Sequence, residues 1–80
     1  MGIKEKIWEI IDEYDGSGKI DECSEEIKDF MNSLEDVATY EIYTDTDVYD
    51  SCGLDIYYIS IAWYTTSGNL NVCGSRLTSH

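Results

Sequence analysis

The chain has 80 residues and a formal net charge of −12, with seventeen Asp and Glu against five Lys and Arg. This length predicts a single domain, residues 1–80, with a small core. The most apolar run, residues 56–64, has nine residues and is too short to cross a membrane. The N-terminus lacks the apolar core and cleavage site of a signal peptide, so we expect a soluble protein.

The acidic residues are concentrated in one part of the chain. All seventeen lie in residues 1–55 together with four lysines, which gives −13 there, whereas Arg76 is the only charged residue in 56–80. The negative electrostatic field of such a charge distribution repels nucleic acid and anionic membranes and attracts basic protein surfaces. We therefore expect a basic protein as partner, and no direct binding to nucleic acid or membrane. The alternative is that the acids only keep the protein soluble.

The residues that usually carry chemistry are few. Cys23, Cys52 and Cys73 are odd in number and form no CxxC pair, which predicts reduced cysteines that pack as small hydrophobes. Reduced cysteines in turn predict a cytoplasmic protein. The only histidine is His80 at the C-terminus, so Ser–His and Cys–His pairs lack a well-placed base, and we expect no Cys/His zinc site. Gly16-Ser17-Gly18 has neither the length nor the lysine spacing of a phosphate loop. We expect a protein that is not an enzyme and needs no cofactor.

Two amphipathic helices are predicted in the first part of the chain. The first has apolar residues at i, i+4, i+7, i+8 and i+11 and ends before Gly16 and Gly18. The second begins with Asp21 or Ser24 as N-cap, and acidic residues suit its positive end. The two apolar stripes are Ile3, Ile7, Ile10, Ile11 and Tyr14 in the first helix, and Ile27, Phe30, Met31 and Leu34 in the second.

From Val37 onwards the period of the sequence changes to two, which is typical of strands. Turn-forming residues at 50–53 and 66–69 separate strands at about 37–49, 54–65 and 70–77. The middle strand is apolar on both faces, as expected at the centre of a three-stranded antiparallel meander. The predicted fold is a two-layer α+β domain of order ααβββ, with a helical hairpin at about 3–36 and a sheet at about 37–78.

The segment Asp15-Gly16-Ser17-Gly18-Lys19-Ile20-Asp21 resembles the calcium loop of EF-hand proteins. With Gly18 at loop position 6, the possible ligands are Glu13, Asp15, Ser17, Lys19 and Asp21. Position 12, which holds a bidentate Glu in EF-hands, is Ser24, and position 1 is Glu13 rather than Asp. We therefore predict a turn that adds acidic charge and no metal site, with a calcium-responsive module as a lesser alternative.

The first predicted strand carries an acidic row on its solvent side. Residues two apart on a strand are separated by about 6.6 Å, comparable to neighbouring phosphates of one nucleic-acid strand. Tyrosines in such a row add flat contact area at low entropic cost. The alternative is a solvated acidic strand that protects a sheet edge. The predicted partner-binding residues are Glu41, Tyr43, Asp45, Asp47 and Tyr49 in the row, and Asp12, Glu13, Asp15, Asp21 and Glu22 around the first turn.

In size, acidity and helices-then-strands order, the whole chain resembles small phage-encoded inhibitors of nucleic-acid-binding effectors. These include anti-CRISPR proteins, antirestriction proteins and uracil-DNA glycosylase inhibitors. The resemblance implies a non-enzymatic inhibitor, with an anti-CRISPR protein favoured, that blocks a basic nucleic-acid-binding surface by DNA mimicry. The alternative is an immunity protein that neutralises a basic nuclease toxin.

Overall fold

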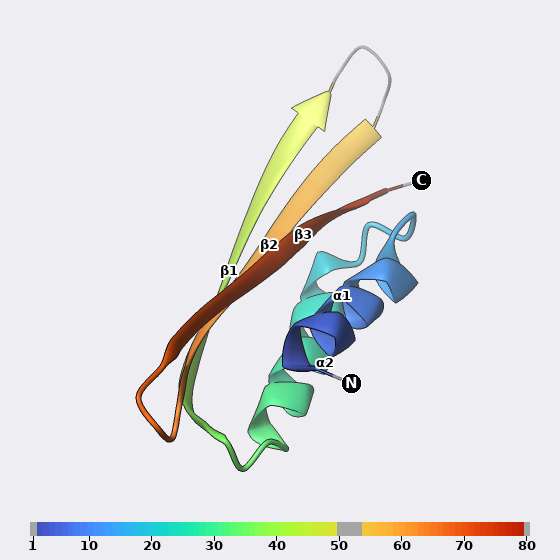
Figure 1. Ribbon diagram of the computed structural model, residues 1–80. Helices are drawn as coiled ribbons and strands as arrows, with labels where there is room; N and C mark the ends of the chain where they lie inside the picture. Colours follow the sequence, from blue (N-terminus) through green and yellow to red (C-terminus); the bar gives the residue numbers. More distant parts are fainter. Residues whose placement is uncertain (1, 50–53, 80) are drawn as a thin grey trace.

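The computed structural model describes the backbone of residues 2–49 and 54–79 and the side chains of residues 2–47 and 55–79. Helices α1 (Ile3–Tyr14) and α2 (Ile20–Asn32) precede strands β1 (Val37–Tyr49), β2 (Leu54–Thr65) and β3 (Leu70–Thr78). The strands form one antiparallel sheet in the order β1-β2-β3, and both helices lie on the same face of it (Figure 1). The predicted α+β class and ααβββ order are confirmed. The predicted turn at 50–53 lies outside the described residues.

Helix α1 forms where isoleucines recur at helical spacing, and Ile7, Ile10 and Ile11 are buried. At its start the Gly2 N–H donates a hydrogen bond to the Glu5 carboxylate at 2.8 Å, which satisfies one of the free donors of the first turn. The helix ends at Tyr14, before Gly16. Neither helix in the described part of the chain is long and apolar enough to cross a membrane.

Helix α2 begins earlier than the sequence predicts, because its N-cap is Lys19 rather than Asp21 or Ser24. The reason is the sharp turn before it: Gly18 has φ +69°, and the Ser17 hydroxyl accepts a hydrogen bond from the Lys19 N–H at 3.2 Å. The helical backbone therefore starts directly after Lys19. Asp21 then lies in the first turn, where its charge favours the positive end of the helix.

The core fills the space between the two helices and one face of the sheet. The central strand β2 contributes most to the sheet side, and cross-strand neighbours such as Ile42, Ile61 and Cys73 lie in one row. Isoleucine and tryptophan suit this half-buried pleated surface, which explains their density in β2. The fully or almost fully buried residues are Ile7, Ile10, Ile11, Cys23, Ile27, Met31, Ile59, Ile61, Trp63, Cys73 and Leu77.

The turn between α1 and α2 binds the end of β3. The N–H groups of Gly16 and Gly18 donate to the Thr78 carbonyl at 3.0 and 3.1 Å. The Thr78 N–H and hydroxyl donate to Asp15 Oδ1 at 2.9 and 3.1 Å. Gly16 and Gly18 both have positive φ, a conformation that glycine adopts without steric cost. The residues of the calcium-loop resemblance therefore make a structural contact. Among the described residues, no three His, Cys, Asp or Glu side chains are placed so that they could hold a metal ion together.

Cys23 is a buried free thiol whose reactivity can be tested. Burial, and secondly the negative charge of Glu26, raise the pKa of Cys23 to about 11. The thiolate is the reactive species, so at pH 8 only about one Cys23 in a thousand is reactive, against roughly a quarter for an unperturbed thiol. We expect iodoacetamide to alkylate Cys23 at least about 100-fold more slowly in buffer than in urea, measured by peptide mass spectrometry. Equal rates, normalised to glutathione in each solvent, would contradict the buried position.

Candidate protein-binding face

The face of the sheet turned away from the helices is uncovered in the described part of the chain, and we call it the open face. On β1, Tyr40 and Ile42 pack against the core, so the residues between and beyond them point the other way. The strand register extends this alternation across the sheet. The described side chains of β1 on the open face include Glu41, Tyr43, Asp45 and Asp47, all of them exposed.

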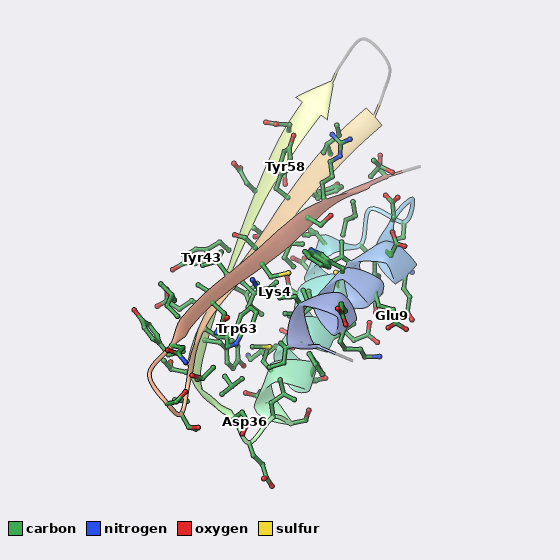
Figure 2. The ribbon with its side chains drawn as sticks, in the orientation of Figure 1. Lys4, Glu9, Asp36, Tyr43, Tyr58 and Trp63 are labelled. Carbon is green, nitrogen blue, oxygen red and sulfur yellow. The ribbon has the colours of Figure 1, made fainter. Side chains whose placement is uncertain are left out.

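Large hydrophobic side chains gather on the open face. Of the six that are exposed among the described residues, Trp8 lies on α1 and the other five lie on this face. Figure 2 shows Tyr43 and Tyr58 on the side away from the helices, and Trp63 on the helix side. A gathered set of exposed apolar residues is typical of an interaction surface, whereas scattered ones are not. The five residues and their exposed fractions are Tyr43 (54%), Tyr58 (36%), Tyr64 (47%), Leu70 (55%) and Val72 (57%).

A shallow hollow of about 460 Å³ lies on this face. Its floor is low because Ser60 and Gly74, the smallest side chains of the region, are paired on neighbouring strands. A Cβ atom at position 74 would stand only 2.8 Å from the Ile59 carbonyl oxygen, so the close strand contact requires glycine there. The residues around this floor include Tyr43, Asp45, Tyr58 and Arg76.

The acidic row on β1 is partly organised by hydrogen bonds. The Tyr43 hydroxyl donates to the Glu41 carboxylate. This bond, followed by the charge of Glu41 and by desolvation, raises the pKa of Tyr43, so the phenol stays neutral at physiological pH. The Asp45 carboxylate accepts a hydrogen bond from the Thr46 N–H at 2.9 Å. The row therefore presents carboxylates and one neutral phenol, a combination suited to Lys and Arg side chains.

The structure places the two predicted groups of partner-binding residues in different layers. Four residues of the strand row lie exposed on the open face, and Tyr49 lies in β1 with its side chain outside the described residues. The second group belongs to the helical layer on the opposite side of the sheet. In that group Asp12, Glu13, Asp21 and Glu22 are exposed, and the Asp15 carboxylate accepts a hydrogen bond from the Thr78 N–H. The two groups do not form one surface.

The helical layer carries a second acidic surface on α2. Its exposed carboxylates surround Tyr14, whose pKa is raised by desolvation and then by Glu26 and Glu22. Lys19 and Glu22 form an exposed ion pair at 3.9 Å, which contributes little to stability. This surface adds to the negative field of the molecule, but lacks the gathered exposed aromatics of the open face. Its carboxylates are those of Asp21, Glu22, Glu25, Glu26 and Asp29.

Sequence reasoning did not assign the apolar part of the open face to partner binding. Its members on β2 and β3 are Tyr58, Tyr64, Leu70 and Val72. The sequence pattern predicts only that they belong to the sheet surface or the core. The available signal was the middle strand, which is apolar on both faces although two short helices can cover only one. The residues of that strand's second face therefore had to remain exposed or meet a partner.

No protein-family model matches this sequence, and no curated protein or solved structure matches the chain.

Proposed function

We propose that this chain is a non-enzymatic inhibitor that binds the basic surface of a nucleic-acid-binding effector, with a CRISPR complex as the favoured target. The observation that supports this is the open face, where the carboxylates of β1 border exposed tyrosines. A basic channel that normally holds nucleic acid offers Lys and Arg side chains for both kinds of group. Such effectors act in the cytoplasm, where the inhibitor would meet them.

Charge would act first, during the encounter. The net charge of −12 is large for 80 residues, and α1 and α2 carry nine of the acidic residues, against three in the strand row. A field of this kind raises the rate of association with a basic partner and weakens as salt is added. The helical acids would thus steer the approach without having to contact the partner.

Contacts on the open face would then hold the complex. Tyr43 and Tyr58 provide rigid, flat area of the kind that dominates interface energetics. The carboxylates of Asp45 and Asp47 would pair with basic side chains that otherwise grip phosphates. Inhibition would be steric, because the occupied channel can no longer admit nucleic acid.

The proposal is tested by reversing charge on the open face. In the double variant Asp45→Lys/Asp47→Lys, like charges would replace the proposed ion pairs, and we expect inhibition to weaken at least about 100-fold. The measurement is target-DNA binding by a panel of guide-loaded CRISPR effectors, followed by fluorescence anisotropy with increasing inhibitor. Circular dichroism should show this variant and the native chain equally folded, because Asp45 and Asp47 are both exposed.

The matched control is Asp12→Lys/Glu13→Lys, which makes the same change of charge on α1. We expect it to weaken inhibition less than about threefold, through slower steering alone. A larger loss from the α1 variant than from the β1 variant would move the contact surface to the helical layer. Absence of inhibition across the panel, with inhibition of basic nuclease toxins instead, would replace the proposal by the immunity-protein alternative.

A further inference from the structure

The hydrogen bonds at the end of β3 fix the direction of the backbone groups throughout the sheet. Thr78 uses its N–H and its carbonyl to bind the α1–α2 turn, so both point away from β2. The Gly74 carbonyl accepts from the Trp8 indole N–H at 3.1 Å and also points away. Backbone groups in an antiparallel ladder alternate between the two sides of a strand. The backbone N–H and carbonyl groups of even-numbered residues of β3 therefore point away from β2, whereas those of odd-numbered residues bond to β2.

By the same alternation, the outer edge of β1 has no neighbouring strand among the described residues. The residues of β2 that bond to β3, such as Ile59 and Ile61, cannot also bond to β1. Their partners on β1 are Thr44 and Ile42. The N–H and carbonyl groups of these two residues therefore point away from β2, in the plane of the sheet, at its outer edge. Within the described residues, these groups make no hydrogen bond to any other segment.

The two edges of the sheet thus differ. The edge of β3 is held at Gly74 by Trp8 and at Thr78 by the α1–α2 turn. On β1 the only such protection in the described region is the Asp45 carboxylate, which occupies the Thr46 N–H. An unpaired edge strand is a template for a further strand from another chain.

A second copy of this chain is a poor occupant of the β1 edge. In an antiparallel pair of β1 strands related by a two-fold axis, odd residues face odd residues. With the axis at position 44, Glu41 would face Asp47, and with the axis at 43, Glu41 would face Asp45. Like charges directly opposite each other destabilise a sheet, so the row disfavours self-pairing.

We propose that the β1 edge accepts an extended basic segment of the partner as a fourth, antiparallel strand. This inference rests on the proposed function and specifies how the partner is recognised. Backbone hydrogen bonds would form at Ile42 and Thr44. Glu41, Asp45 and Asp47 would occupy non-hydrogen-bonded positions on either side of this pair, where residues of neighbouring antiparallel strands come closest, about 4.5 Å between Cα atoms.

This geometry specifies the pattern of the partner segment. Read from its N-terminus, its first residue lies opposite Asp47, the third opposite Asp45 and the seventh opposite Glu41. Those three positions would be Lys or Arg, whose side chains would lie on the open face. The fifth position lies opposite Tyr43 and would take a residue that packs on its ring.

The probe is a seven-residue peptide with lysine at positions 1, 3 and 7, threonine at 5 and valine at 2, 4 and 6. We expect the amide hydrogens of Ile42 and Thr44 to exchange at least about tenfold more slowly with saturating peptide, measured by NMR. The outward amide of Val72 on β3 should be unchanged. Binding should weaken as salt is added, because three ion pairs contribute to it.

Two controls separate strand addition from charge attraction alone. The first is the same peptide N-methylated at positions 2, 4 and 6, which keeps every charge but removes the donors facing β1; it should bind at least about tenfold more weakly. The second is the variant Thr44→Pro, which removes one outward N–H and leaves the β1–β2 ladder intact, since proline is tolerated at an edge in this orientation. It should weaken binding of the unmodified peptide to a similar degree.

Equal binding of the methylated and unmodified peptides, or slowed exchange on α2 instead of β1, would overturn strand addition even if Thr44→Pro failed to fold. The inhibition assay distinguishes this failure from failure of the proposed function. If Asp45→Lys/Asp47→Lys abolishes inhibition and a folded Thr44→Pro does not, the open face is the site but no strand is added. If neither change alters inhibition, the proposed site on β1 is wrong.

Discussion

Replacing Ile61 by alanine is expected to lower the free energy of unfolding by about 2–5 kcal/mol. Ile61 is completely buried at the middle of the central strand, with Ile42 and Cys73 beside it and the helices above it. The change removes buried methyl and methylene groups and leaves a cavity that rigid strands on both sides cannot close. A domain of this size has a total stability of roughly 4–12 kcal/mol, so the variant would lose a large share of it.

The matched control is Val72→Ala, on the neighbouring strand but on the open face. Val72 is 57% exposed, so its truncation removes little buried area and should cost less than about 1 kcal/mol. Urea unfolding followed by circular dichroism measures both variants. Similar losses for the two would mean that the open face is also packed, for example inside an oligomer, and the loss at Val72 would then depend on protein concentration.

The fold followed from the sequence because its signals were local and agreed with one another. The isoleucine stripe of α1 and the period-two pattern after Val37 each specify one element, and the double-faced β2 specifies the central strand. Two short helices and three strands then leave essentially one arrangement with a common core. The start of α2 was the local error, because the Ser17–Lys19 hydrogen bond in the turn carries no obvious pattern.

The candidate site followed from the sequence only in part. Alternation along β1 put Glu41 and Asp45 on the solvent side, and the structure agrees. The hollow above Ser60 and Gly74 depends on the register between β2 and β3, which turn residues alone do not fix. The unpaired edge of β1 depends on which backbone groups β2 shares with β3. Both features arise from pairing between distant residues, and no local pattern encodes them.

The strand row also illustrates how two hypotheses can be compatible. Acids on an edge strand discourage self-association, which is the protective role considered from the sequence. The same acids leave the edge available to a basic strand, because the repulsion acts only on like-charged partners. An edge of this kind selects its partner by charge and binds it by backbone hydrogen bonds. The protective and the binding interpretations therefore describe one surface.

Asp15, in the segment that resembles a calcium loop, is expected to stabilise the domain through its hydrogen bonds to the end of β3. In Asp15→Ala the N–H and hydroxyl of Thr78 lose the carboxylate that accepts both of their hydrogen bonds. Bonds to a charged acceptor contribute more than neutral ones, and solvent replaces part of the loss because Asp15 is exposed. We expect the free energy of unfolding to fall by about 1–3 kcal/mol. Asp15→Asn keeps a neutral acceptor oxygen and should lose less.

Asp12→Ala is the matched control, since it removes an exposed carboxylate from the same end of α1 whose side chain is not bonded to β3 in the described structure. It should change stability by less than about 0.5 kcal/mol. Calcium at millimolar concentration should leave the unfolding midpoint of the native chain unchanged, whereas a ligand bound only by the folded state would raise it. A calcium-dependent rise that Asp15→Ala abolishes would restore the metal-site alternative. Without such a rise, a loss confined to Asp15→Ala would show that this carboxylate joins the helical hairpin to the end of β3.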